Sequence, residues 1–502
     1  MNRKIAKVSL LSAALLVMFG TAHAAPIPFG SSAKYVEVAT IPATATGSAS
    51  AANIVVITKQ PVRAGSPHPS DELITLVDSR GPVYSVDETT GAVKTIMDLR
   101  TATSGLVGST ATAGNAELGV RGLAYHPDFA TPGAAGYLKF YTMSCHATST
   151  RTLAGAIPLN HNIPPSTAPI DAGKPRPSVP CDNVLSEWQM KAPSATNSGL
   201  TRDTAVARRE VLRFPQMYTN HGTDALVFDP LTKLLYIAAG DGGGQGDPLG
   251  VASNPAYLYG KILRFNPLKP GATVPTSMKK SNDGHWSYPI NNPGYGNPGR
   301  DAYYIRGFRH PETMFISGRD LIVADIGGSK FEEINVVKLH PGEDVSVATG
   351  DEGKSFGWDG VEGRLLNTEA NTIPDSEMSS TIPPVSGYFT DGVQHTRPAA
   401  IIVGGVPVNT MGAAFNGQLI FGDIVSGRIF YGSMSDMKAR RTWPMGMVAI
   451  QEVDLYNNAG ARASLMTTYG RNSRVDLRLS EINGTIYGTT KQTGKLFKLM
   501  AR

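Results

Sequence analysis

A histidine followed by a glycine-rich, acid-bearing cluster is the arrangement in this sequence best suited to proton transfer. His221 opens an apolar run to Phe228, and the next apolar run ends at Gly240-Asp241-Gly242-Gly243-Gly244. A neutral imidazole titrates near physiological pH and suits a general base, and a glycine-rich loop allows a ligand to approach closely. Asp241 and Asp247 could bind an ion here, although turn chemistry explains them as well. Taken alone, the pattern favours a surface histidine before an ordinary hairpin, so its meaning depends on the rest of the chain.

The elements that must position this histidine are short strands. Glycine (54 residues) and proline (35 residues) are spread through the 502-residue chain and break long helices. Apolar, β-rich runs bounded by turn residues recur instead, at irregular spacing. They include 73–77 with 83–86, 234–237, 321–324, 418–421 with 428–431, and 485–487 with 495–499. This recurrence predicts an all-β propeller or similar array with loop insertions rather than two sandwiches, because no Pro/Ser-rich linker divides the chain in half.

The N-terminus has the pattern of a cleavable export signal. Arg3, Lys4 and Lys7 precede an apolar segment, 8–19, and Ala22-His23-Ala24 is a small-x-small site, so cleavage is expected near Ala24-Ala25. We therefore expect a periplasmic or secreted protein without a membrane span. Removing 1–24 takes three positive residues and no negative one, and the formal charge falls from +5 to +2. No basic patch indicates a nucleic-acid partner.

The two cysteines, Cys145 and Cys181, flank a polar, proline-rich segment that has the composition of an insertion, at about 145–200. An oxidising compartment permits these cysteines to pair, and the bridge would restrain the excursion. The alternative is two unpaired thiols; compartment and count favour the bridge.

Several ordered blocks of sequence resemble one known family. They are ELGVRGLAYHPDF (117–129), the Asn220-His221 block, GKILRFNP (260–267), GFRHP (307–311), ADIGGSKFEEINVV (324–337), FGW with EG (356–358 and 362–363), and GDIVSGRI (422–429). In order and spacing these blocks resemble the soluble glucose/aldose-sugar dehydrogenases, also called glucose/sorbosone dehydrogenases, that use pyrroloquinoline quinone (PQQ) and calcium. The resemblance covers about residues 73–499.

The resemblance implies a six-bladed β-propeller of four-stranded antiparallel blades over 71–502, after an N-terminal arm and the start of the propeller at 25–70. It also implies an oxidoreductase that oxidises an aldose or related polyol and passes electrons to an external acceptor. His221 aligns with the catalytic base. Glu117, Arg309, His310 and Arg428 are then expected at the quinone.

The same resemblance implies a set of calcium ligands. Backbone carbonyls near Gly327 and Gly328 would hold the ion beside the quinone, and Glu332 and Glu333 could serve a second, structural site. Phe356 belongs to the same group of expected metal residues. Calcium accepts carbonyl and carboxylate oxygens with flexible geometry, which such a segment can supply. A solvated strand edge is the alternative explanation for the two glutamates.

The chain also departs from the family pattern. Thr223-Asp224 replaces a Gly-Gly pair, His310 replaces an asparagine, and Arg121 replaces a leucine. The late regions 403–408 and 424–426 lack the basic residues that neutralise the carboxylates of the quinone, with Arg428 displaced from the expected place. The missing basic residues leave open a non-redox propeller that binds sugars or a protein, since a fold does not fix a function. A calcium-dependent lactonase with inward-facing acidic ligands is a further alternative.

Overall fold

The computed structural model describes most of the chain. The described residues are 25–42, 52–62, 74–108, 117–153, 156, 176–192, 205–297, 300–342, 349–366, 380–443, 445–491 and 493–502. The predicted signal peptide and much of the predicted insertion lie outside these residues, so both stay predictions.

Four antiparallel sheets of four strands follow one another along the chain. The first contains β2 (Ile54–Lys59), β3 (Ile74–Asp78), β4 (Pro82–Val86) and β5 (Val93–Asp98). The second contains β6 (Val120–Tyr125), β7 (Lys139–His146), β8 (Cys181–Met190) and β9 (Ala205–Gln216). The third contains β10 (Thr223–Phe228), β11 (Leu235–Ala239), β12 (Lys261–Phe265) and β15 (Tyr303–Arg306). The fourth contains β16 (Pro311–Ser317), β17 (Asp320–Asp325), β18 (Phe331–Lys338) and β21 (Ser386–Phe389).

The remaining long strands form one eight-stranded sheet. It contains β22 (Ile401–Gly405), β23 (Gln418–Asp423), β24 (Ile429–Ser433), β25 (Gln451–Tyr456), β1 (Phe29–Thr40), β28 (Lys495–Ala501), β27 (Thr485–Thr490) and β26 (Leu477–Ile482). Two short hairpins complete the strands of the described residues: β13 (Met278–Lys280) with β14 (Ser287–Pro289), and β19 (Val361–Glu362) with β20 (Leu365–Leu366).

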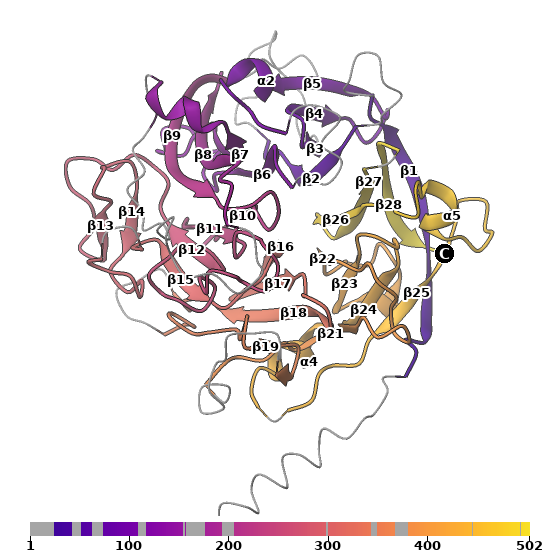
Figure 1. The fold of residues 1–502 in the computed structure, drawn as a ribbon. Helices are drawn as coiled ribbons and strands as arrows, with labels where there is room; N and C mark the ends of the chain where they lie inside the picture. Colours follow the sequence, from indigo (N-terminus) through magenta and orange to yellow (C-terminus); the bar gives the residue numbers. More distant parts are fainter. Residues whose placement is uncertain are drawn as a thin grey trace, which may run out of the picture.

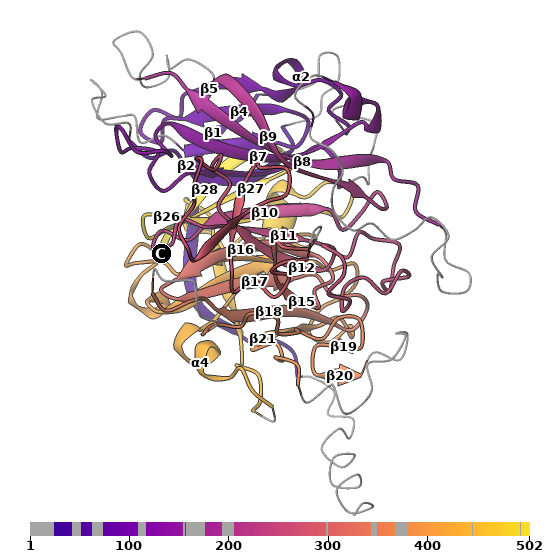
Figure 2. The same ribbon diagram turned by 90° about the vertical axis from the view of Figure 1, so that its left-hand side faces the viewer.

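The sheets lie around a common centre and form a propeller-like ring (Figure 1). Their innermost strands contact one another in sequence, β2 with β6, β6 with β10, β10 with β16, β16 with β22, β22 with β26, and β26 again with β2. Seen from the side, successive sheets stack against each other (Figure 2). Middle strands such as β3 and β11 are buried along their whole length, which explains their continuous apolar sequences.

The predicted all-β class and propeller-like arrangement are confirmed, but the predicted six separate four-stranded blades are not found. Among the described residues there are four such sheets and one sheet of eight. The merger arises because β1 pairs in parallel with β25 and antiparallel with β28. A strand from the start of the chain thus joins two strand groups from its end, a long-range pairing that no local sequence pattern specifies.

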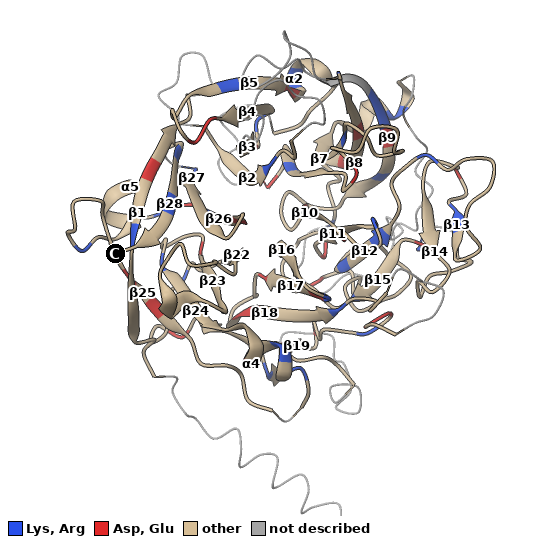
Figure 3. Cartoon of the chain, turned by 180° about the vertical axis from the view of Figure 1, so that it is seen from behind, with Lys and Arg blue, Asp and Glu red and all other residues tan. Residues whose placement is uncertain are grey.

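Helices contribute little to the described residues. The α-helices are α2 (Leu99–Ala102), α4 (Met434–Ala439) and α5 (Leu465–Tyr469), with 3₁₀ turns at Thr148–Thr152 and Ala413–Phe415. No helix in the described ranges has the length and hydropathy to cross a membrane. Acidic and basic residues occur in every part of the ring and neither sign is confined to one sector (Figure 3).

Register shifts interrupt the innermost strands where they begin. The pairing of β6 shifts between Val120 and Gly122, that of β10 between Thr223 and Leu226, and that of β16 between Pro311 and Thr313. A β-bulge turns a side chain away from the regular alternation of a strand. Arg121, Asp224 and Glu312 lie within these three shifts, and all three are buried.

The predicted disulfide is confirmed. Cys145 in β7 and Cys181 in β8 are bridged, with Cα atoms 5.7 Å apart. The bridge packs in a small buried cluster with Leu118, the residue after Glu117. The covalent link therefore anchors the segment that carries one of the predicted site residues.

Candidate functional site

A pocket of about 500 Å³ gathers most of the residues that the sequence singled out. It lies where the loops between β9 and β10, β15 and β16, and β17 and β18 meet. Its lining includes the predicted residues Glu117, His221, Arg309, His310, Gly327, Gly328 and Glu332, together with Asn220, Gln245, Ile326, Ser329, Thr390, Arg397, Pro398, Ala399, Ala400, Val425 and Arg474.

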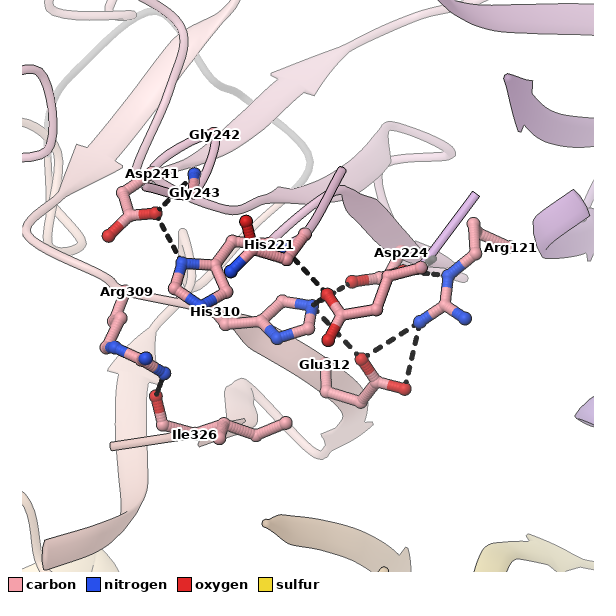
Figure 4. Close-up of polar contacts among 12 residues, drawn as sticks. Arg121, His221, Asp224, Asp241, Gly242, Gly243, Arg309, His310, Glu312 and Ile326 are labelled. Atoms are coloured by element: carbon pink, nitrogen blue, oxygen red, sulfur yellow. Dashed lines mark hydrogen bonds and ion pairs between the residues drawn. The ribbon is translucent and has the colours of Figure 1, made fainter. Parts of the chain in front are cut away.

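His221 is held by two carboxylates from different loops. Its backbone is in the left-handed region, with φ +50°, and its N–H donates to Glu117 Oε2 over 2.7 Å. Its ring nitrogen Nδ1 lies 2.7 Å from Asp241 Oδ1 (Figure 4). Asp241 in turn accepts hydrogen bonds from the Gly243 N–H and from Trp358 Nε1. The acid therefore fixes both the direction and the tautomer of the imidazole, and leaves Nε2 as the acceptor.

The surroundings keep the His221 imidazole uncharged at neutral pH. Burial lowers its pKa, the positive charge of Arg309 lowers it further, and Asp241 only partly opposes both. A neutral ring with Nδ1–H bound to a carboxylate and Nε2 unprotonated has the state and orientation that a general base needs. From the sequence, Asp241 was predicted to be a turn residue or an ion ligand. Its position in the glycine-rich cluster after β11 was the one sequence feature that could have indicated its role in orienting His221.

A second histidine, His310, lies beside the first with opposite surroundings. The two rings are stacked, 5.2 Å apart between centroids and 26° between planes. Nε2 of His310 lies 2.6 Å from Asp224 Oδ2, 3.1 Å from Glu312 Oε2 and 3.4 Å from Glu117 Oε2. Burial alone would lower the pKa of His310, but Glu117 and Asp224 raise it well above its usual value.

Two arginines complete this inner network. Arg121 pairs with Asp224 through Nε and with both oxygens of Glu312 through Nη2, and Arg478 Nη2 lies 2.9 Å from Glu312 Oε1. Asp224, His310 and Glu312 also place three potential metal-ligand atoms within 4.8 Å of one another. Because two guanidinium groups already bind the carboxylates, we assign no metal to this group. Three of the residues that depart from the pattern of the resembling family, Arg121, Asp224 and His310, thus belong to one network.

Arg309 lies beneath His221 in the same pocket. Nη1 donates to the Ile326 carbonyl over 3.0 Å, Nη2 lies 3.3 Å from Gln245 Oε1, and the guanidinium is 5.6 Å from the Trp358 ring. Its Nε has no hydrogen-bond partner among the described residues. Asp325 Oδ2 and Oδ1 accept the backbone N–H groups of Arg309 and His310, which fixes this loop against the end of β17. Arg309 thus keeps hydrogen-bonding capacity for an acidic ligand.

The glycine pair 327–328 lies in a crowded, oxygen-rich loop. A Cβ on Gly327 would lie 1.8 Å from the Phe331 carbonyl, and one on Gly328 would lie 3.2 Å from Glu362 Oε2. Glu362 Oε1 accepts three backbone N–H groups, whereas its buried Oε2 has no partner among the described residues. Burial raises the pKa of Glu332 to about 8, with Asp423 contributing.

Three of the predicted residues are not brought to this pocket lining. Glu333 binds the Gly363 N–H and the Asn335 amide, and Phe356 stacks on Phe308 in the core. Arg428 lines a different pocket, where it pairs with Glu452 at 2.7 Å and binds the Gln394 carbonyl. The sequence prediction missed Arg397 and Arg474, which do line the central pocket. Neither arginine lies in one of the sequence blocks that resemble the known family, so no motif marked it.

Comparisons with known proteins agree on the fold. No protein-family profile matches the chain. A PQQ-bound aldose sugar dehydrogenase from Streptomyces coelicolor superposes with a TM-score of 0.53 at 16% identity, over 94% of this chain and 99% of that one. A glucose dehydrogenase gives 0.54 at 12% identity over 93% and 99%, and a calcium structure of an AA12 carbohydrate-active enzyme from Trichoderma reesei gives 0.52 at 12% over 95% and 98%. The chain has the fold of these proteins.

Two plant proteins are similar in sequence. The HIPL2 protein of Arabidopsis thaliana is 27% identical over 58% of this chain and 40% of its own length, and HIPL1 is 25% identical over 73% and 52%. The chain therefore spans about half the length of these curated relatives or less.

Proposed function

We propose that this protein is an exported quinoprotein oxidoreductase that oxidises a hydroxyl of an aldose or related polyol, with PQQ and calcium. The observation that carries the proposal is the Asp241–His221 pair, an oriented and uncharged imidazole at the edge of a pocket rich in arginine. The fold shared with a protein described as a PQQ-bound aldose sugar dehydrogenase supports it.

Oxidation of a sugar hydroxyl needs a base for the O–H proton and an acceptor for the hydride. When bound, the quinone supplies the acceptor and calcium polarises its carbonyl. Nε2 of His221 accepts the proton from the hydroxyl. Asp241 then stabilises the imidazolium that forms, while the Glu117 carboxylate keeps the backbone of His221 in place.

The pocket residues fit a quinone with three carboxylates. Arg309, Arg397 and Arg474 line one cavity of about 500 Å³, and Arg474 also pairs with Asp476 at 2.7 Å. Arg309 Nε lacks a partner among the described residues, and Arg397 makes only a 3.4 Å contact with Thr390 Oγ1. Guanidinium forks bind carboxylates in pairs of hydrogen bonds. Arg397 and Arg474 take the place of the late basic residues that the sequence lacks, and Arg428 is left out of the proposal.

The glycine loop fits calcium. Because Gly327 and Gly328 have no Cβ, their backbone passes close to the Phe331 carbonyl and to the Glu362 carboxylate, which has a buried oxygen without a partner among the described residues. Glu332, with its raised pKa, is a second carboxylate whose ionised form a cation would favour. Calcium prefers oxygen ligands of these kinds. We propose that this loop, with Glu332 and Glu362, holds the ion.

We also interpret the eight-stranded sheet as two blades of a six-bladed propeller, joined by β1. The signal pattern at the N-terminus supports export. The sequence has two cysteines and no Cys-x-x-Cys-His haem motif, so electrons would pass to a separate carrier.

The test is a PQQ titration of the purified protein in millimolar calcium, followed by a dye-reduction assay over a panel of aldoses and polyols. PQQ binding with sugar-dependent dye reduction is the expected result, and turnover should be lost in His221→Gln with binding retained. A protein that binds no PQQ would overturn the proposal and favour the non-redox binding propeller. Calcium-dependent lactone hydrolysis without PQQ would favour the lactonase instead.

A further inference from the structure

The two stacked histidines of the pocket, His221 and His310, have partners that shift their protonation in opposite directions. His221 contacts one carboxylate, Asp241, and lies close enough to Arg309 for that charge to oppose its protonation. His310 contacts three carboxylates, with Asp224 Oδ2 at 2.6 Å and Glu312 Oε2 at 3.1 Å. Pairs of titratable groups whose surroundings push their protonation in opposite directions mark separate acceptor and donor roles.

The charges around His310 favour a positive ring. The carboxylates facing it are Glu117 from the loop before β6, Asp224 from β10 and Glu312 from β16. The positive groups facing the same carboxylates are Arg121 from β6 and Arg478 from β26. Lys491, after β27, is also close to Glu312, but burial lowers its pKa to about 7. Two guanidinium groups leave one carboxylate charge uncompensated, and the imidazolium neutralises it.

One nitrogen of that ring is left for a ligand. Nε2 is directed to the carboxylates (Figure 4), whereas Nδ1 has no hydrogen-bond partner among the described residues. His310 lines the central pocket together with Arg309. A protonated imidazole donates from both nitrogens, so Nδ1–H is an unused donor in a nearly buried part of the pocket wall.

We propose that His310 is a charged hydrogen-bond donor of this pocket, with Nε2–H held by Asp224, Glu312 and Glu117 and Nδ1–H binding an anionic oxygen of the ligand. The inference rests on the proposed function, because it assigns a specificity role within the same pocket. Beside it, His221 accepts a proton from a neutral hydroxyl. The pocket thus distinguishes two kinds of ligand oxygen, an alcohol next to His221 and a carboxylate-like oxygen next to His310.

The charge state can be read without any ligand. The chain has ten histidines, so histidine-selective ¹⁵N labelling gives a small set of ring signals. At pH 7.5 we expect long-range ¹H–¹⁵N spectra to show His310 protonated on both nitrogens and His221 on Nδ1 alone. Spectra of His310→Asn and His221→Gln assign the two rings. A neutral His310 at pH 7.5 would overturn the inference whatever the ligand.

The ligand contact is tested by PQQ binding, followed by tryptophan fluorescence in millimolar calcium. His310→Asn keeps a donor of similar size but no charge, and should weaken binding about tenfold or more, because charge-assisted hydrogen bonds are stronger than neutral ones. His285→Asn, outside the pocket, is the control and should bind like wild type. Thermal unfolding of both variants checks that they are folded.

The outcomes separate the two proposals. Unchanged affinity in a folded His310→Asn would overturn the role of His310 and leave the proposed function standing. If the wild-type protein binds no PQQ, the proposed function fails, and the His310 Nδ1 signal is then followed during a titration with sodium gluconate. A shift of that signal would support an acidic sugar as the source of the anionic oxygen, and no shift at high millimolar gluconate would overturn the inference.

Discussion

Two pockets of equal size, about 500 Å³ each, differ in how their charged groups are paired. In the pocket at the rim, near β24 and β25, Arg428 pairs with Glu452 and Arg462 pairs with Asp454, and the Arg462 side chain is 57% exposed. In the central pocket the His221 and His310 side chains are only 5% and 2% exposed and have unequal partners. The two pockets have the same volume, and what distinguishes the central one is a pair of buried histidines whose pKa values are shifted in opposite directions.

Removing the proposed base, His221, should give the largest difference in turnover between variants of the two pockets. In PQQ-loaded protein, His221→Gln should lower sugar-dependent dye reduction by about 10³- to 10⁴-fold, because the proposed general base is then missing. PQQ affinity should change little. Arg462→Gln in the rim pocket is the matched control and should keep wild-type turnover. An equal loss in both variants would contradict the distinction between the pockets.

The orienting acid gives the next largest effect. Asp241→Asn keeps the shape but presents an amide to Nδ1, which favours the wrong tautomer of His221, and kcat should fall about 100-fold. The measurement is steady-state kinetics with the same dye. Asp454→Asn removes a similar carboxylate from the rim pocket and should leave kcat unchanged. Wild-type kcat in Asp241→Asn would mean that the loop alone positions the base.

The charge of Arg309 should be visible in the pH profile. Because burial and Arg309 lower the pKa of His221, the acidic limb of kcat/KM in the wild-type protein should lie below pH 6.5. Arg309→Gln removes a charge that disfavours protonation, so the limb should move to higher pH. Arg428→Gln should leave it in place. A limb that stays fixed in Arg309→Gln would show that the charge of Arg309 does not contribute to this pKa.

The smallest effect belongs to the rim pair. Arg428→Gln breaks a partly exposed ion pair and should lower the free energy of unfolding by about 1 kcal/mol or less, as urea denaturation measures. PQQ affinity should not change. A large loss of PQQ affinity would instead return Arg428 to the quinone site that the sequence suggested for it.

Local patterns in the sequence were sufficient to predict several of the strands and part of the candidate site. The predicted runs 83–86 and 321–324 lie within β4 and β17, because period, turn residues and burial are all local properties. Glu117, His221 and Arg309 were found through short motifs, and the structure brings all three to one pocket.

What the sequence left out depends on pairing across the ring. Asp241 is joined to His221 by loop geometry, and Arg474 reaches the pocket from a segment far along the chain. The network of Arg121, Asp224 and Glu312 depends on three register shifts, which no periodicity of apolar residues reveals. Arg121 and Asp224 had appeared only as departures from a pattern, and Glu312 had not been singled out. Their mutual contacts give the departures a physical explanation.

The position of β1 has a consequence for the order in which the molecule can be completed. This strand is made first, yet its partners β25 and β28 begin at Gln451 and Lys495, more than 400 positions later. The backbone hydrogen-bonding groups of β1 cannot pair with these strands until most of the chain has been synthesised. Pairing between strands so distant in sequence slows folding. Loss of residues up to Thr40 would expose two strand edges at once, on β25 and on β28, each open to pairing with another chain. The strand β1 thus closes the ring by joining β25 to β28.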